Sequence, residues 1–317
     1  MATNTRTALF ARNTPGGVFT IDDLAEHPGN IFFVDSTHAN KGVTTGHGTS
    51  PDSPLSTLAY AFSSDLLASG DTVYLMPSHA ESVIAAAGIV CDIAGVRVIG
   101  LGNNRTRPTI TFNTDVAADI DIDAANITFR NIRFIGNIAA LAAPIDVNAA
   151  GFTMEDCDFY VAGATTDIDI TVITDDAAND MVIRRCSFNY DCSNEATGVA
   201  VSAASTEVIR LVGADRAVID NNYFSGNFAT SVINGITTKS MDVRISNNRI
   251  YNDQTANVAG IVDLVAGCTG VISDNVGFHG YATDLATTID PSSCAMVRNY
   301  FSNVVTEAGG LVGTAST

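Results

Sequence analysis

The most regular feature of the sequence is a short phrase of alternating apolar and polar positions that recurs between residues 127 and 301. In Ile127-Thr-Phe-Arg-Asn-Ile-Arg-Phe134, apolar side chains two residues apart lead to a polar corner and then to a last apolar residue. Alternation by two is typical of a strand with one buried face, whereas an amphipathic helix places apolar residues three and four apart. The last apolar residues of the copies, called anchors below, are Phe134, Phe159, Phe188, Phe224, Ile250, Phe278 and Phe301.

The spacing of the anchors predicts the architecture. It ranges from 23 residues (278 to 301) to 36 residues (188 to 224). Short strands that recur about every 27 residues fit the coils of a solenoid, stacked about 4.8 Å apart. We therefore predict an all-β fold, a right-handed parallel β-helix solenoid with two or three strands per coil. The additional residues of the longest repeat are placed in the loop 190–197.

Like residues also recur at the position two before each anchor. Stacked coils would bring such residues together in ladders, and stacked Asn side chains hydrogen-bond along the stack. Asn275 lies three residues before its anchor and is one step out of register. We interpret this series as structural rather than as a binding site; its members are Cys157, Cys186, Asn222, Asn248 and Asn299.

The rest of the chain is organised around the repeats. A terminal coil of a solenoid exposes its core and needs a cover. The stretch 55–67 has Leu58 and Phe62 on one helical face and Ser56 as a helix start, so it predicts a capping helix. Four parts result, namely an irregular N-terminal arm, a cap with the first coil, the β-helix coils and a C-terminal tail, at residues 1–30, 31–94, 95–301 and 302–317.

Composition removes several classes of function. The net charge is −18, from 34 acidic and 16 basic residues, so the chain would be repelled by nucleic acid and by anionic membranes. The longest apolar run, 83–91, is far too short to cross a bilayer. The first 20 residues show no secretory signal. The six Cys lack close CxxC pairs, so we expect buried thiols, no metal site and no cofactor.

One segment near the start carries a family resemblance. It reads Val34-Asp-Ser-Thr-His-Ala-Asn-Lys-Gly-Val-Thr-Thr-Gly-His-Gly-Thr-Ser-Pro-Asp-Ser-Pro-Leu-Ser-Thr57 and is followed by Gly70-Asp-Thr-Val-Tyr74 and Pro77-Ser-His-Ala-Glu81. These segments resemble the opening of right-handed parallel β-helix proteins of the pectin-lyase-like class, with Ser78-His79-Ala80 in place of a Gly-x-Tyr. The polar loop is similar to that of virion proteins of tailed bacteriophages. The resemblance covers about 50 residues, and this fold hosts lyases, hydrolases, tailspikes and structural parts.

The best candidate site is a row of carboxylates. In Asp119-Ile-Asp-Ile-Asp123, alternation turns the isoleucines to one face and the carboxylates to the other. If following coils continue the row, an acidic stripe runs along one sheet. It is interpreted first as a solvated outer face, with cation binding and carbohydrate cleavage by paired carboxylates as alternatives. Its candidate residues are Asp119, Asp121, Asp123, Asp146, Asp167 and Asp169.

We predict no catalytic residue and no enzymatic activity. Sugar-binding clefts usually offer indole platforms, and this chain has no Trp. Only Lys41 and Lys239 supply lysine side chains. The Tyr residues beside the anchors are explained by packing at the corners of the coils.

The function implied by the resemblance is structural. We expect a phage virion protein that decorates or cements the outside of the head, in a virion assembled in the host cytoplasm. Its partner would be the major capsid protein, contacted through residues 1–30 with the cationic Arg6 and Arg12. Similar proteins imply a homotrimer. The alternative is a tail-associated receptor-binding protein or tailspike that binds polysaccharide or acts as a lyase or glycoside hydrolase. A secreted β-helix enzyme is disfavoured by the missing signal.

Overall fold

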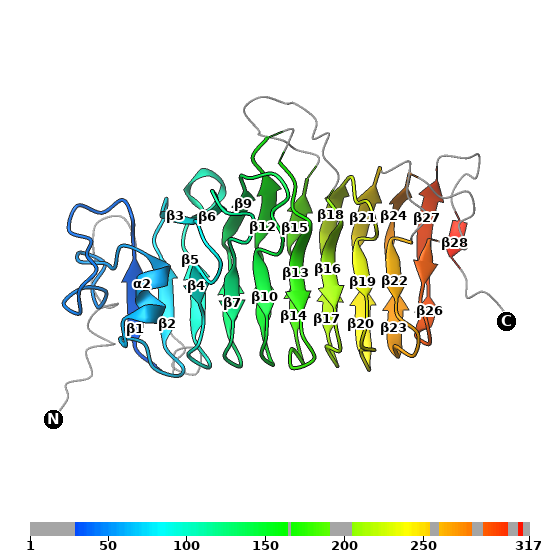
Figure 1. The fold of residues 1–317 in the computed structure, drawn as a ribbon, viewed down its shortest axis with the longest axis horizontal. Coiled ribbons are helices and arrows are strands. Elements are labelled where there is room, and N and C mark those ends of the chain that lie inside the picture. The colour runs from blue at the N-terminus through cyan, green and yellow to red at the C-terminus, as the bar shows by residue number, and fades with distance from the viewer. Residues whose placement is uncertain are drawn as a thin grey trace.

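The chain winds as a parallel β-helix in which three sheets run along the whole solenoid (Figure 1). The computed structural model describes residues 29–163, 166–190, 205–253, 260–280, 288–303 and 310–312. From β3 to β27 the strands alternate regularly among the three sheets defined below, in the order sheet III, sheet II, sheet I. All strand pairs described within these sheets are parallel except the last, β27 with β28. The predicted fold class is confirmed.

The three sheets contain ten, eight and ten strands over the described residues. Sheet I consists of β1 (Ile31–Val34), β2 (Thr72–Leu75), β5 (Arg97–Gly100), β8 (Thr128–Arg130), β11 (Thr153–Glu155), β14 (Val182–Arg184), β17 (Val218–Asp220), β20 (Val243–Ser246), β23 (Gly270–Ser273) and β26 (Ala295–Val297). Sheet II consists of β4 (Ile89–Val90), β7 (Ile120–Ile122), β10 (Ile145–Val147), β13 (Ile170–Thr174), β16 (Glu207–Leu211), β19 (Ile233–Gly235), β22 (Val262–Leu264) and β25 (Ile289–Asp290). Sheet III consists of β3 (Ala80–Val83), β6 (Thr109–Phe112), β9 (Arg133–Gly136), β12 (Asp158–Val161), β15 (Ser187–Asn189), β18 (Tyr223–Gly226), β21 (Arg249–Asn252), β24 (Val276–His279), β27 (Asn299–Asn303) and β28 (Gly310–Val312).

The core is a set of side-chain stacks that run along the solenoid axis. Phe134, Phe159, Phe188 and Phe224 pair in register, and their ring centroids are 4.7, 5.0 and 5.0 Å apart. Stacked aromatic rings bury large apolar areas and add a favourable ring–ring interaction. The alternating phrase of the sequence therefore forms the interior, as predicted.

The anchor predicted at position 278 is wrong by one residue. Ile250 pairs with Gly277, and Gly277 pairs with Phe301, so Phe278 points outward and stacks on Tyr251 at 5.1 Å. A Cβ on Gly277 would lie 1.7 Å from the carbonyl oxygen of Ile250. Only glycine fits at this close approach, which periodicity in apolar residues does not reveal.

The shifted anchor also brings Asn275 into register, two residues before Gly277. Its Oδ1 accepts hydrogen bonds from the backbone N–H and the Nδ2 of Asn248, both at 3.0 Å. Its own N–H donates to Asn299 Oδ1 at 3.1 Å. Asn222 begins this run by accepting from the N–H of Cys186 at 2.9 Å. The predicted structural ladder is confirmed, and the one-step offset predicted for Asn275 is wrong.

The predicted capping helix is present but shorter than expected. Helix α2 (Leu58–Ser63) begins after Thr57, whose Oγ1 accepts from the N–H of Tyr60 at 3.1 Å, so the cap is Thr57 and not Ser56. Asp65 has a φ of 55°, a left-handed conformation that ends the helix before position 67. Leu58, Ala61 and Phe62 are buried against the first coils. A 3-10 helix, η1 (Asn104–Thr106), lies ahead of β6.

A buried network ties the helix to the first coil. The Glu81 carboxylate accepts from the N–H groups of Leu58 and Ala59 at 2.6 and 3.0 Å, in the first turn of α2. His79 Nε2 lies 3.2 Å from Glu81 Oε2, and His79 Nδ1 accepts from the N–H of Ser36 at 3.0 Å. Helix N-termini favour such an anionic partner. The network therefore joins residues from three parts of the cap.

Several predicted segments fall partly or wholly outside the described residues. These include residues 1–28 of the arm with Arg6 and Arg12, and residues 191–197 of the long loop. Of the predicted tail, β28 is described and pairs antiparallel with β27. The described Cys residues are buried free thiols. Among the described residues, no helix has the length and apolar character needed to cross a membrane.

Candidate functional site: the acidic face of sheet II

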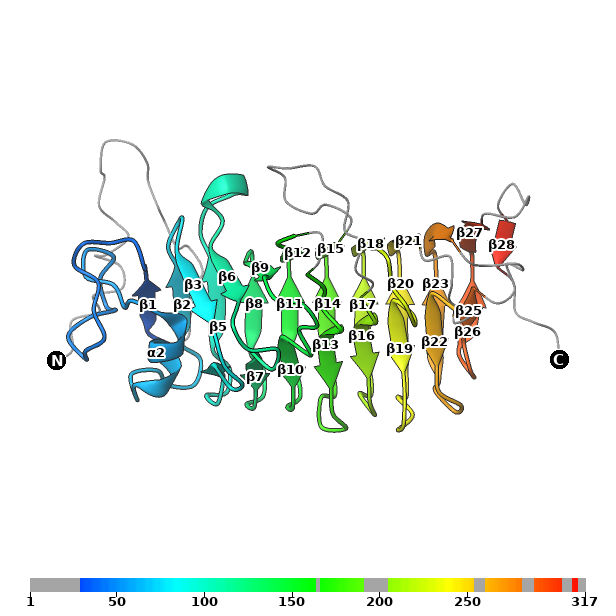
Figure 2. The same cartoon turned by 45° about the horizontal axis from the view of Figure 1, so that its top comes forward.

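The strands of sheet II follow one another along the solenoid (Figure 2), and their register brings one outward residue from each strand into a continuous row. Alternation turns Ile120, Ile122, Ile145 and Val147 inward, where they are buried. The residues between them face outward. From the N-terminal end the row reads Val90, Asp121, Asp146, Ile173, Arg210, Asn234, Asp263 and Asp290.

The N-terminal part of this row brings together the first predicted carboxylates. Asp121 and Asp146 are direct register partners on β7 and β10, and Asp119 and Asp123 flank Asp121. Parallel strands lie about 4.8 Å apart, so these carboxylates are near neighbours. Asp123 Oδ1 accepts from Asn148 Nδ2 at 3.0 Å. The predicted stripe is thus present over the coils that contain β7 and β10.

The environment of these carboxylates disfavours their charge. Partial burial, followed by the neighbouring charges of Asp121 and Asp146, raises the pKa of Asp119 to about 6, although the Ala87 N–H opposes the shift from 2.5 Å. Burial, then Asp121 and Asp175, raises the pKa of Asp146 to about 6. Like charges at close range disfavour ionisation in this way. The face therefore holds groups that exchange protons near neutral pH.

Asp167 and Asp169 do not continue the row. They lie ahead of β13, where Ile168 bridges to Leu141, and the partner of Asp146 on β13 is Ile173. Asp167 Oδ1 accepts from the N–H of Ala140 at 2.8 Å. The prediction that they extend the stripe is corrected, because this coil starts its strand later than the alternating Asp-Ile-Asp pattern suggests.

Sequence reasoning missed the most buried carboxylate of this face, Glu207. It accepts two hydrogen bonds from Arg210, both at 2.8 Å, and one from Asn234 Nδ2 at 2.7 Å. Residues three apart on a regular strand point to opposite faces. Here the N–H groups of Val208 and Ile209 both donate to the carbonyl of Val232, which is a β-bulge and turns Glu207 toward Arg210.

Three further carboxylates of this face, Asp175, Asp263 and Asp290, were also missed. Asp263 and Asp290 are register partners, and the pKa of Asp263 is raised by burial and then by Asp290 and Glu207. The only signal of Asp263 and Asp290 in the sequence is an Asp beside an apolar residue in a short strand, and Asp175 directly follows a strand. Within the described part of the chain, no three His, Cys, Asp or Glu side chains form a group that could hold a metal ion.

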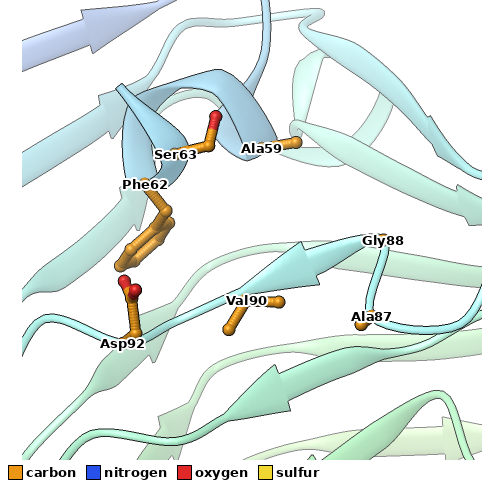
Figure 3. A pocket seen from close by; sticks show the side chains of 7 residues that line it. All are labelled: Ala59, Phe62, Ser63, Ala87, Gly88, Val90 and Asp92. Carbon is orange, nitrogen blue, oxygen red and sulfur yellow. The ribbon is translucent and has the colours of Figure 1, made fainter. Parts of the chain in front are cut away.

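A cavity of about 230 Å³ lies at the N-terminal end of the row, between α2 and β4 (Figure 3). Ala59, Phe62 and Ser63 line it from the helix, and Val90 and Asp92 from the strand side. Since Val90 is the register partner of Asp121, the cavity adjoins the acidic row. The site as a whole offers a strip of carboxylates that ends in a small, partly apolar hollow.

The comparisons with known proteins concern the fold. No model of a known protein family matches the sequence. No curated protein matches it either. Among solved structures, a protein named rhamnogalacturonan lyase is similar at 10% identity and a TM-score of 0.48, over 88% of this chain and 90% of that chain. The pectate lyase Pel9A is similar at 13% identity and a TM-score of 0.47, over 91% of this chain and 80% of that chain.

The prediction that the chain has no enzymatic activity is wrong. It rested on the missing Trp and the shortage of Lys, yet both of these similar solved structures are lyases by name. At these identities the likeness is one of fold and assigns no activity to this chain.

Proposed function

We propose that the chain is a structural component of a tailed-phage particle, a β-helix mounted on the outer surface of the head. The observation that supports this proposal is the construction of the cap. The segments that resemble the opening of β-helix proteins, one of which contains the polar loop similar to that of phage virion proteins, meet in one unit, where the N–H of Ser36 donates to His79 and Glu81 accepts from the start of α2. The resembling segments therefore contact one another in the folded cap, which would not be expected of segments that match by chance.

The solenoid suits a part that must stand out from a surface. Its stacked core adds burial and backbone hydrogen bonds with every coil, without flexible hinges between coils. Its net charge of −18 keeps free subunits soluble. In this proposal the major capsid protein is the partner, residues 1–30 with Arg6 and Arg12 make the contact, and the virion is assembled in the host cytoplasm. The homotrimer stays a prediction.

The test is co-sedimentation with heads that lack this protein. The full chain is expected to sediment with the heads, and Arg6→Glu with Arg12→Glu to weaken binding at least tenfold. Arg105→Glu is the control for either single substitution, because Arg105 is an exposed arginine of η1 and each Arg→Glu change alters the net charge by the same amount. Failure of the full chain to bind heads, or labelling of tails instead, would overturn the proposal.

A second candidate function is polysaccharide cleavage on the acidic face of sheet II. Retaining glycosidases hold two carboxyl groups about 5–5.5 Å apart, which is close to the spacing of neighbouring strands such as those of Asp121 and Asp146. A pKa of about 6 for Asp146 lets one member of such a pair be protonated while the other is ionised. This observation favours acid–base chemistry at these two residues.

Incubation with bacterial capsule and with pectin-type polymers tests this candidate. Release of reducing ends that is lost in Asp146→Asn but kept in Asp290→Asn would support it, because both residues lie in the same outward row. Unsaturated ends would indicate elimination, and saturated ends hydrolysis. No release from any polymer by the unmodified chain would remove the candidate and leave the head-surface proposal unaffected.

A further inference from the structure

The cavity between α2 and β4, called the cap cavity below, plays no part in either proposed function. Its volume of about 230 Å³ is below the roughly 300–1,000 Å³ of pockets that take drug-sized ligands. Small side chains keep it open on both walls. They are Ala59 and Ser63 of the helix and Ala87 and Gly88 ahead of the strand. Its size therefore suits a single amino-acid side chain.

The middle of the cap cavity is apolar. Phe62 covers it from the helix, and Val90, the outward residue of β4, forms its floor (Figure 3). Val90 is only half-buried, so part of its side chain faces the hollow. An aliphatic chain that entered between these two side chains would be removed from water on both sides, which is favourable.

Carboxylates surround the edge of the cap cavity on the strand side. Asp92 lines it, and its side chain points toward Phe62 (Figure 3). The floor residue Val90 pairs with Asp121 of the next coil, about 4.8 Å away. Two further carboxylates flank Asp121 on the same outer face. They are Asp119 and Asp123.

Two observations place these carboxylates around one short stretch of β4. Asp119 Oδ1 accepts from the N–H of Ala87 at 2.5 Å, and Ala87 lines the cap cavity. Burial, and after it the charges of three carboxylates, raises the pKa of the Cys91 thiol, which directly follows Val90. These carboxylates are Asp92, Asp121 and Asp123.

The four carboxylates have no internal counter-charge. Among the residues that the structure describes, Asp92, Asp119, Asp121 and Asp123 form no ion pair with a basic side chain. The acidic residues that do form one are Glu81, Glu155, Asp156, Asp158, Asp180, Glu207 and Asp274. The edge of the cap cavity is therefore negatively charged, beside an apolar middle.

We propose that the cap cavity binds one lysine or arginine side chain of a partner protein. Such side chains bury their aliphatic stems along apolar surface and keep the charged group near water. The stem would lie between Phe62 and Val90, and the charged group would reach the carboxylates at the edge. The proposal goes beyond the two proposed functions, because any protein that presents a basic side chain satisfies it.

The composition of the cap cavity disfavours other occupants. An acidic group would be repelled, and a purely apolar side chain would leave the carboxylates without a counter-charge. Within the described part of the chain, no three His, Cys, Asp or Glu side chains could hold a metal ion there. A basic side chain complements both the apolar middle and the charged edge.

The experiment is a methyl NMR titration of the full chain with Nα-acetyl-lysine amide. At about 0.01 M salt, the methyl signals of Ala59 and Val90 are expected to shift. Those of Val271 and Val297, exposed on sheet I at the other end of the solenoid, should stay constant. The affinity should fall at least fivefold at about 1 M salt, because salt screens the attraction between exposed charges.

Two variants separate the charged edge from the apolar middle. Asp92→Asn removes the carboxylate that lines the cavity and should weaken binding at least threefold. Asp290→Asn is its matched control, because it removes the same charge from the outward row at the far end of sheet II. Ala59→Leu should fill the cavity and abolish the shift at Val90.

The proposal has clear ways to fail. Nα-acetyl-norleucine amide has the same stem without the charge, and equally tight binding of this probe would assign the cavity to an apolar ligand. Equal weakening by Asp92→Asn and Asp290→Asn would show only general attraction to an acidic protein. A titration that leaves Val90 unshifted in the unmodified chain would also overturn the proposal. None of these results bears on binding to phage heads.

Discussion

Sheets I and II both consist of short parallel strands at the same coil spacing, yet charged residues are arranged differently on their outer faces. On sheet I, Arg130, Glu155, Arg184 and Asp220 are successive register partners, so the sign of the charge alternates from coil to coil. On sheet II, Asp121 meets Asp146, and no base stands beside either of them in the row before Ile173.

The electrostatic consequences follow this difference in neighbours. Arg185 binds Asp156 through Nε at 2.8 Å and Glu155 through Nη2 at 3.0 Å, and the hydrogen bond from Arg185 lowers the pKa of Asp156. On sheet II, burial and like charges raise the pKa of Asp119 and Asp146 to about 6. Adjacent strands are about 4.8 Å apart, so the residue one coil away decides whether the charged form of a carboxylate is stabilised or destabilised.

The core shared by both faces sets the scale against which the surface effects are compared. Phe188 is fully buried, and its ring stacks on Phe159 and Phe224, both at 5.0 Å. Phe188→Ala is expected to lower the free energy of unfolding by about 3–5 kcal/mol, measured by urea titration. Val116→Ala, at an exposed position, should change it by less than about 0.5 kcal/mol. A core loss no larger than the surface effects below would contradict the central role of the Phe stack.

Neutralising one carboxylate on each face compares the faces directly. Glu155→Gln removes an acceptor of Arg184 and Arg185, and we expect a loss of about 1–2 kcal/mol in the free energy of unfolding because the arginines are partly exposed. Asp146→Asn removes a repelled charge and should instead raise the melting temperature. Each variant removes one negative charge. Changes in stability of the same sign in both variants would therefore contradict the difference between the two faces.

The pH dependence of stability gives the smallest expected effect. Asp119 and Asp146 have pKa values of about 6 in the folded chain and about 3.9 in an unfolded one, so the folded state binds these protons more tightly. Stability from them is present at low pH and is lost as the pH rises through about 6. The melting temperature should increase on the order of 1 °C per site between pH 7 and pH 5, after screening by solvent.

Below that range the other face dominates. The pKa values of Asp156 and Asp274 are lowered by their arginine partners, so the stability that they contribute is lost as the pH falls below about 4. The curve should therefore have its maximum between about pH 4 and pH 6. Asp119→Asn with Asp146→Asn should flatten only the rise from pH 7 to pH 5, and Glu155→Gln should leave that rise intact. A melting temperature that falls steadily from pH 7 to pH 5 would contradict the assignment.

Much of the fold could be predicted because each repeat carries the apolar core residues and polar corner residues that the coils of a solenoid stack on one another. Phe134, Phe159, Phe188 and Phe224 mark one core stack, and the Asn residues mark one corner. The prediction failed at Gly277, where the side chain that would have marked the register is absent. It also placed the start of α2 one residue early, because Ser56 and Thr57 are both good caps and only the observed hydrogen bond selects Thr57.

The candidate site could be predicted only in part. In the Asp119–Asp123 segment, alternation with apolar residues is sufficient to predict that the carboxylates face outward. Asp146 likewise lies between two apolar residues. Glu207 could not be found in this way, because the bulge at Val208 and Ile209 breaks the alternation that links sequence to face. Asp167 and Asp169 failed for the opposite reason, since an alternating pattern lies there outside a strand.

The amino-acid sequence by itself determined that this chain is a stack of β-coils with a capped N-terminal end, because periodic alternation specifies which side chains are buried. Tertiary structure alone decided which charges meet. Residues that face each other across coils are 24 to 41 positions apart in the chain, so a glycine, a bulge or a late strand start in one coil changes which side chains that coil presents to its neighbours. The acidic face of sheet II exists only once that register is set.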